Sequence, residues 1–352
     1  MKIGITSDLH LTTSQQNPER FAALENIFAQ LNRLAIAHLI IAGDLFDVKY
    51  DNFAEFESIC RLPANRHIRI YIIPGNHDVN ISQSGITVEN VRVISKPEIV
   101  SFDSENTNFL FLPYLEGKSM GDMIQVFSNT IESEKWVLIG HGDWLGNVKD
   151  VNPYEPGIYM PLSQRDLDTY KPSRVFLGHI HASYNGEKVY YAGSPCSIDI
   201  TETGRRYFLI FDTLSNNVEN RIVDTAFLNF NKTFTVFPME NETDEIEVKL
   251  KGWVDAWGLT PEEKPKARVR VKFAGYSNDK NVLNRVIKNT LSDFQLYEEP
   301  DLSEVSLNTD STRGYIVNLV SEKINQSSWM DGIGIPDKDQ VLLDAIRIIY
   351  RR

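Results

Sequence analysis

The sequence predicts an α+β fold: a sandwich of sheets flanked by helices, followed by a smaller α+β domain. Over the first half of the chain, short apolar runs alternate with amphipathic helical patterns, and most runs end in a polar cluster. After about residue 235 the pattern changes to an acidic stretch, one alternating strand and several amphipathic helices. We therefore expect domains at 1–235 and 236–352, since 352 residues are enough for two hydrophobic cores.

The first three apolar runs, at 3–7, 38–42 and 68–73, are expected to be buried strands. Apolar residues at helical spacing predict helices over 19–37 and 53–61, between those strands. This alternation is typical of open α/β sheets, in which ligands gather at the carboxyl ends of the strands.

The rest of the larger domain contains both kinds of element. Residues 91–112 alternate apolar and turn residues, which predicts antiparallel strands, and a helix is expected at 120–131. Further strands are expected at 136–140, 175–178, 189–192 and 207–211, with a loop at 153–161.

In the smaller domain, residues 240–247 are acidic and predict a linker or an edge. Residues 264–273 alternate strictly, which predicts a strand with one basic face. The basic residues are Lys264, Lys266, Arg268, Arg270 and Lys272. They either contact DNA phosphates or form the solvated face of an edge strand. Helices are expected at 282–294, 315–325 and 337–350, and the last either docks a partner or closes the core.

Composition excludes several classes of protein. The net charge of −12 argues against a surface that coats nucleic acid by charge alone. Two cysteines, Cys60 and Cys196, are too few for a disulfide framework or a thiolate metal site. There is no signal-peptide pattern, and no apolar run approaches the ~18 residues that span a bilayer. We expect a soluble cytoplasmic protein that does not contact a membrane.

Five polar clusters follow predicted strands. They are Asp8-x-His10, Gly43-Asp44-x-x-Asp47, Gly75-Asn76-His77-Asp78, Gly140-His141 and Gly178-His179-x-His181. Five of the seven histidines lie in these clusters, and none follows His181. Each cluster alone is also compatible with an ordinary turn. Together they favour a site for divalent metals that prefer mixed nitrogen and oxygen ligands without sulfur.

The arrangement resembles the calcineurin-like metallophosphoesterase superfamily over residues 1 to about 235. The resemblance implies a four-layer α/β/β/α sandwich and two divalent metal ions. The implied ligands are Asp8, His10 and His181 for one ion, Asn76, His141 and His179 for the other, and Asp44 for both. Two such ions clamp a phosphoryl group and lower the pKa of a bridging water, and the resulting hydroxide attacks phosphorus in line.

Two further residues of these clusters have implied roles. In the superfamily, the histidine that matches His77 faces the leaving group, which implies a general acid or a donor to the developing charge. The residue that matches Asp47 orients this histidine, which implies a His-Asp dyad. Asp78 either only caps the next turn or takes part in the site.

Within the superfamily, the layout resembles SbcD-type DNA-repair nucleases. Protein Ser/Thr phosphatases carry Arg-Gly and a final glutamate where this chain has Val48-Lys49 and Asp78. The SbcD-like features are Leu177-Gly178-His179-Ile180-His181, the run Tyr191-Ala192-Gly193-Ser194-Pro195, and a pattern over 268–294 that is similar to the DNA-capping domain of that family.

This resemblance implies a DNA exonuclease and endonuclease that uses two divalent metal ions, which we expect to be Mn²⁺. The implied partners are DNA, an SbcC-like SMC-type ATPase and a second copy of the chain, in DNA repair or recombination. The alternative is a phosphodiesterase or phosphatase for a small nucleotide or lipid-linked phosphodiester, with the small domain as a lid. A non-enzymatic scaffold would lack catalytic residues, whereas His77 and all seven implied ligands are present.

Overall fold

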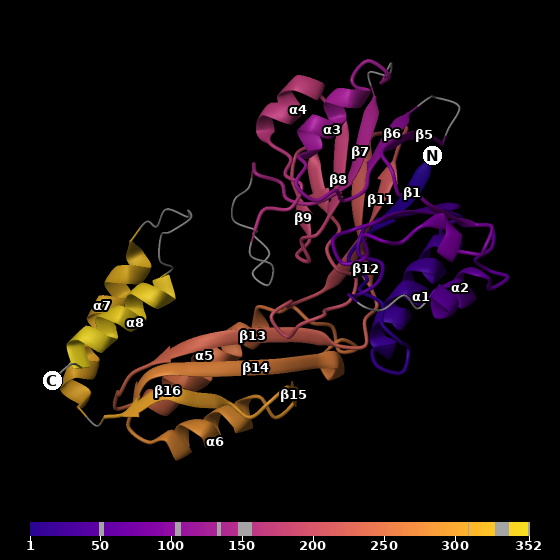
Figure 1. Ribbon diagram of the computed structural model, residues 1–352. Coiled ribbons are helices and arrows are strands. Elements are labelled where there is room, and N and C mark those ends of the chain that lie inside the picture. Colours follow the sequence, from indigo (N-terminus) through magenta and orange to yellow (C-terminus); the bar gives the residue numbers. More distant parts are fainter. Residues whose placement is uncertain are drawn as a thin grey trace. The chain divides into compact units, whose positions relative to one another are not determined.

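A computed structural model describes the protein at residues 1–48, 53–102, 107–131, 135–146, 157–308, 310–327 and 338–350. Lys49, residues 153–156 of the expected loop and Asp337 lie outside these ranges. The chain divides into two compact units (Figure 1). The first contains residues 1–198 and 205–226, and the second contains 199–204 and 227–352.

The first sheet of the first unit has six strands. In spatial order they are β12 (Asn217–Val223), β11 (Arg206–Asp212), β1 (Lys2–Thr6), β2 (His38–Ala42), β3 (Arg69–Ile73) and β4 (Val91–Val93). β1 to β4 are parallel, so the carboxyl ends of β1, β2 and β3 meet at one edge of the sheet.

The second sheet of the first unit also has six strands. In spatial order they are β5 (Glu98–Ser101), β6 (Asn108–Leu112), β7 (Trp136–His141), β8 (Arg174–Gly178), β10 (Val189–Tyr191) and β9 (Tyr184–Asn185). β6, β7, β8 and β10 are parallel, which brings the ends of β7 and β8 together.

Three apolar layers hold the first unit together. Helices α1 (Pro18–Arg33) and α2 (Phe53–Cys60) pack on the first sheet, and α3 (Met120–Phe127) and α4 (Gln164–Tyr170) on the second. Ile40 and Phe176, from different sheets, are buried in the layer between them. Apolar side chains therefore fill each gap of a four-layer α/β/β/α sandwich, which confirms the predicted fold class.

The second unit is built on a parallel sheet. Its elements are β13 (Leu228–Val236), α5 (Glu242–Asp255), β14 (Ala267–Ser277), α6 (Lys280–Thr290), β15 (Gln295–Leu296), β16 (Asp301–Leu307), α7 (Ser311–Gln326) and α8 (Lys338–Tyr350). Leu250 of α5 and Ile287 of α6 pack with Val269 and Val271 of β14 in one apolar cluster. α8 closes a separate small cluster through Ile346.

Several predicted elements differ from the structure. α1 ends at Arg33 and not at residue 37, because the backbone turns at Ala35, where φ is +52°. The antiparallel prediction for 91–112 is right only for β5 and β6. β4 pairs in parallel with β3, and the chain crosses between the sheets near Pro97.

Three expectations for the second unit differ from the structure. The acidic stretch 240–247 is not a linker, because Glu242, Asp244 and Glu245 form the first turn of α5, where negative charge stabilises a helix. Lys264 and Lys266 are not on the strand, because they begin and end a short 3₁₀ helix, Lys264–Lys266, that contains Pro265. β14 is also no edge strand, because it has paired neighbours on both sides.

Candidate metal centre

The structure brings the five polar clusters of the first unit together. Asp8 and His10 follow β1, Asp44 and Asp47 follow β2, and Asn76 and His77 follow β3. His141 ends β7, while His179 and His181 follow β8. The sandwich thus gathers side chains that lie up to 173 residues apart in the sequence, between Asp8 and His181.

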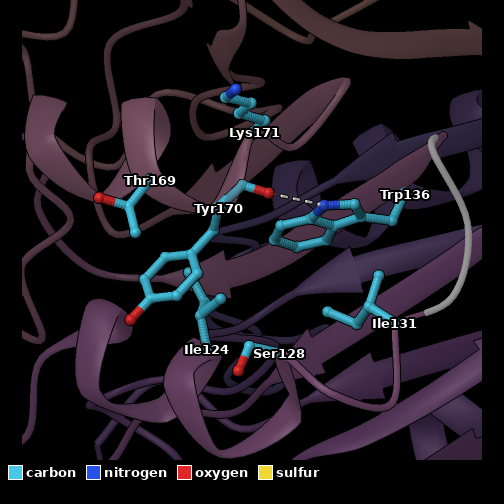
Figure 2. Close-up of a pocket in the computed structure, with 7 residues that line it drawn as sticks. All are labelled: Ile124, Ser128, Ile131, Trp136, Thr169, Tyr170 and Lys171. Atoms are coloured by element: carbon cyan, nitrogen blue, oxygen red, sulfur yellow. Dashed lines mark hydrogen bonds between the residues drawn. The ribbon is translucent and has the colours of Figure 1, made fainter.

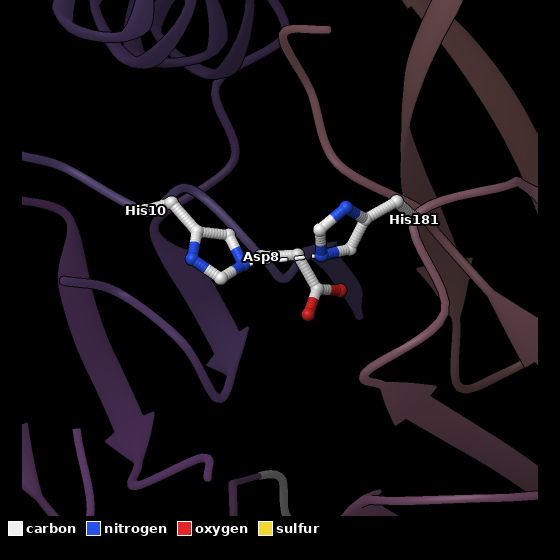
Figure 3. A group of neighbouring side chains, drawn as sticks. All are labelled: Asp8, His10 and His181. Atoms are coloured by element: carbon white, nitrogen blue, oxygen red, sulfur yellow. Dashed lines mark hydrogen bonds between the residues drawn. The ribbon is translucent and has the colours of Figure 1, made fainter. Parts of the chain in front are cut away.

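Asp8, His10 and His181 form the first half of the cluster. Each offers one ligand atom, and these atoms lie within 4.8 Å of one another (Figure 3). Nε2 of His10 lies 3.1 Å from Nε2 of His181. Asp8 is fixed by the hydroxyl of Ser7 and by the backbone N–H of His179, which both donate to its carboxylate. Two imidazole nitrogens beside a carboxylate are a ligand set for a divalent ion.

Asn76, His141 and His179 form the second half. Oδ1 of Asn76 lies 2.8 Å from Nε2 of His141 and 3.2 Å from Nδ1 of His179. Nδ1 of His141 donates to the carbonyl of Ala42, so Nε2 is the nitrogen of this ring that faces Asn76. Nε2 of His141, Oδ1 of Asn76 and Nδ1 of His179 can all be ligands of one divalent ion.

Asp44 lies between the two halves. Its Oδ2 is 3.3 Å from Nε2 of His141 and 3.7 Å from Nε2 of His10. Burial favours the neutral carboxyl, but the positive charge of His141 outweighs it and holds the pKa of Asp44 far below its usual range. Burial likewise opposes protonation of His141, but the Asp44 charge raises the pKa of His141 to about 9.

The backbone around these side chains is unusual in ways that fit a metal centre. Among the described residues, eight non-glycine residues have positive φ. Four of them are implied ligands: Asp8, His10, Asp44 and His179. Such conformations cost roughly 1–3 kcal/mol each and are typical of functional sites. A Cβ on Gly75 would lie 2.1 Å from Oδ1 of Asp44, so this position has room only for glycine.

His77 and Asp47 lie beside the first half. Nδ1 of His77 is 3.4 Å from Oδ1 of Asp47, and the His77 ring packs edge-on against His10. Burial raises the pKa of Asp47, but hydrogen bonding to His10 and His77 more than reverses this and keeps the carboxyl ionised. A nitrogen of His77 is also within 4.8 Å of ligand atoms of His10 and Asp44, so His77 borders the metal positions.

Asp78 is buried and connects the turn at Gly75 to the loop that follows β2. Its side chain accepts hydrogen bonds from the backbone N–H groups of Gly75 (2.7 Å), Leu45 (2.9 Å) and Phe46 (3.2 Å). Burial and the nearby charge of Asp44 raise the pKa of Asp78 to about 7. Its function is to hold the Gly75 turn against the loop after β2.

Our sequence reasoning missed Asp143. Its Oδ1 lies 3.7 Å from Nε2 of His179, and its Oδ2 accepts a hydrogen bond from the backbone N–H of Tyr159. A carboxylate on the far nitrogen of a metal-binding histidine orients the ring. The available signal was an acidic residue two positions after His141.

The remaining candidate residues are in the second unit. Arg268, Arg270 and Lys272 lie on the face of β14 opposite its buried side chains, and all three are half-buried. The guanidinium of Arg268 lies 4.2 Å from the ring centre of Phe227 and 5.0 Å from that of Tyr297. We call this set of three residues the basic row. Lys264 and Lys266 lie in the turn before it.

A cavity of about 420 Å³ lies elsewhere in the first unit. Trp136, Ile124 and Tyr170 line it, and Nε1 of Trp136 donates to the carbonyl of Tyr170 (Figure 2). Trp136 begins β7 and His141 ends it, so the strand separates the two by roughly 16 Å. The cavity is therefore not part of the metal centre.

A family model described as calcineurin-like phosphoesterase matches residues 1–183, more than half of the chain. One similar solved structure comes from a structural and functional characterization of a novel archaeal phosphodiesterase. It has 15% identity and a TM-score of 0.35, over 63% of this chain and 99% of that one. No curated protein matches the chain. Among the described residues, no helix is long and apolar enough to cross a membrane.

Proposed function

We propose that this chain, which belongs to the calcineurin-like phosphoesterase family, is an SbcD-type nuclease that hydrolyses DNA phosphodiesters with Mn²⁺. Family membership makes it a metal-dependent phosphoester hydrolase. The proposal adds the substrate, the identity of the metal and a place in DNA repair or recombination.

The convergence of six nitrogen- and oxygen-bearing side chains around a seventh, Asp44, carries the proposal. The first half would hold one divalent ion and the second half another, with Asp44 reaching both. When bound, the two ions would supply Lewis-acid stabilisation of the phosphoryl group and acidify a water between them. The ligands are nitrogen and oxygen atoms without sulfur, which suits Mn²⁺ among other divalent ions.

His77 is placed to act on the leaving group. Asp47 lies 3.4 Å from its Nδ1, so the carboxylate favours a proton on that nitrogen, and an imidazolium could then release the proton on Nε2. His77 would give this proton to the leaving oxygen as the bond to phosphorus breaks. Asp47 would stabilise the positive charge of the ring until then.

The basic row of the second unit supports DNA as the substrate. Arg268 has no carboxylate within ion-pair distance among the described residues, and Arg270 donates to the side chain of Asn231. Lys272 lies 3.6 Å from Asp301. Basic groups spaced along one strand can each meet a phosphate without reading sequence. Such a row has no evident use for a small substrate.

The helical pair α7–α8 supports a protein partner. Tyr315 and Leu319 of α7 are 66% and 48% exposed, and they lie one helical turn apart on the same face of the helix. Ile348 of α8 is 67% exposed. These exposed apolar side chains belong to two helices that contact each other, and exposed apolar surface is a common feature of protein interfaces. An SbcC-like SMC-type ATPase is the partner that we propose for this face.

The test is a nuclease assay on blunt, hairpin and single-stranded DNA, with Mn²⁺ and with a chelator. We expect Mn²⁺-dependent cleavage, and we expect His77→Ala to abolish it while Mn²⁺ still binds by calorimetry. Hydrolysis of bis-p-nitrophenyl phosphate without cleavage of any DNA would instead favour the small-phosphodiester alternative. Full nuclease activity of His77→Ala would remove the assigned role of His77.

A further inference from the structure

Arg20 is a buried arginine that the family motifs do not include. It lies in the first turn of α1, and its side chain is 8% exposed. A buried guanidinium is costly unless it is paired. One nitrogen, Nη1, donates both to the carbonyl of His10 and to Oδ2 of Asp47, the latter at 3.3 Å.

The two oxygens of the Asp47 carboxylate have different neighbours. Oδ2 faces Arg20, whereas Oδ1 faces Nδ1 of His77 at 3.4 Å and Nδ1 of His10 at 3.8 Å. The torsion that turns a carboxylate is soft and roughly two-fold. The two oxygens are chemically equivalent, so what the contacts set is the plane of the carboxylate. The backbone N–H of Val48 donates to Oδ1 at 2.8 Å, and the bond from Arg20 to Oδ2 holds the other end, which keeps an oxygen directed at His77.

We propose that Arg20 is a positioning residue, which acts through Asp47 to keep His77 in the orientation that protonates the leaving oxygen. The proposal rests on the proposed function of His77. In the reaction, His77 gives its Nε2 proton to the leaving oxygen while the P–O bond breaks, so a neutral imidazole and an alcohol remain. Arg20 touches neither the substrate nor this proton.

A purely structural role for Arg20 makes a different prediction. Its bond to the carbonyl of His10 holds a residue whose φ is +46°. If this were its main function, loss of Arg20 would disturb the implied ligand His10, and metal binding would weaken. Activity would then fall equally on every substrate.

The activity test compares two substrates in Arg20→Met, Arg20→Lys and Asp47→Asn. The leaving group of bis-p-nitrophenyl phosphate departs without a proton, whereas the alkoxide of an oligonucleotide needs one. We expect kcat on the oligonucleotide to fall about 100-fold, the usual contribution of a general acid. We expect less than about a five-fold loss on bis-p-nitrophenyl phosphate, with KM unchanged. Equal losses on both substrates would overturn the proposal.

Two controls sharpen this test. Arg33→Met changes an exposed arginine at the other end of α1 and should leave both rates unchanged. The double variant Arg20→Met with Asp47→Asn should lose no more than Asp47→Asn alone, because the two residues act in one chain of contacts. Losses that multiply would contradict the proposal.

A readout without turnover separates this inference from the proposed function. In the metal-free protein, ¹⁵N spectra of the imidazoles should show a single His77 tautomer with the proton on Nδ1. The His77→Gln variant identifies that signal. Arg20→Met and Arg20→Lys should convert it to a mixture of tautomers, with Mn²⁺ affinity unchanged by calorimetry. An unaltered His77 signal would overturn the inference, even if the wild-type chain cleaves DNA.

Discussion

The metal centre of the first unit and the basic row of the second are both polar, but they are built in opposite ways. Asp44 and His141 are almost fully buried, and each shifts the pKa of the other. Arg268 and Lys272 are half-buried, and each has its own local contacts. Buried polar groups in a network depend on one another, whereas surface charges act almost independently. Single substitutions should therefore have large effects in the centre and small, additive ones in the row.

Asp44→Asn is the substitution with the largest expected effect, and it tests whether the metal centre behaves as a network. Because Asp44 faces both halves of the centre, we expect kcat to fall by about 1,000-fold, or about 4 kcal/mol of barrier, with loss of Mn²⁺ binding. Calorimetry and hydrolysis of bis-p-nitrophenyl phosphate measure this. The control is Asp212→Asn, which alters an ion pair with the N-terminus. Turnover at the wild-type rate would show that the centre is not a network.

A pair of glycine substitutions compares the two units directly. Gly75→Ala places a Cβ against Asp44, so we expect about a 100-fold loss of kcat, typical of a misplaced catalytic group. Gly252→Ala in α5 meets open space, and we expect it to raise the free energy of unfolding by roughly 0.5–1 kcal/mol. Urea unfolding and kinetics measure both. Equal changes of kcat and of the free energy of unfolding in the two variants would contradict the difference between the two units.

Asp78→Asn tests the hydrogen bonds that hold the Gly75 turn against the loop after β2. The amide cannot accept all three backbone hydrogen bonds, so we expect unfolding to become easier by about 1–3 kcal/mol. Thermal unfolding of the metal-free protein measures this effect. The variant should retain His77-dependent chemistry at low temperature. A stability equal to that of the wild type would mean that water replaces the lost acceptor.

The smallest effects per residue are expected in the basic row. Arg268→Gln, Arg270→Gln and Lys272→Gln should each weaken DNA binding only several-fold. Together they should lower the slope of log affinity against log salt by about 2, with bis-p-nitrophenyl phosphate hydrolysis unchanged. Fluorescence anisotropy at several salt concentrations measures this. Lys264→Gln with Lys266→Gln is the matched control, and an equal change of slope there would remove the special role of the row.

The sequence predicted the first unit well because its signals are local. Apolar runs such as 38–42 end directly in polar clusters, and parallel strands must bring those ends together. The strand order, and the crossing near Pro97, depend on long-range pairing that no short pattern contains. The residues that support the site, such as Arg20, were not predicted for the same reason. In the sequence Arg20 is an ordinary helix arginine, and only the fold shows its contact with Asp47.

In the second unit, local composition was misleading. The acidic residues at 242–245 look like a linker, yet they are typical of the first turn of a helix. The alternation at 264–273 predicted β14 but could not show that Lys264–Lys266 form a separate 3₁₀ helix before it. It also could not show that β16, far along the chain, makes β14 an interior strand.

The left-handed backbone at Asp8, His10, Asp44 and His179 has a consequence for heat tolerance. Glycine adopts these angles without strain, but at Asp8 and Asp44 it would also leave the buried backbone N–H groups of His179 and His77 without their acceptors. The relief of strain and the lost hydrogen bonds therefore oppose each other at these positions. A search for more heat-stable variants here would remove implied metal ligands first.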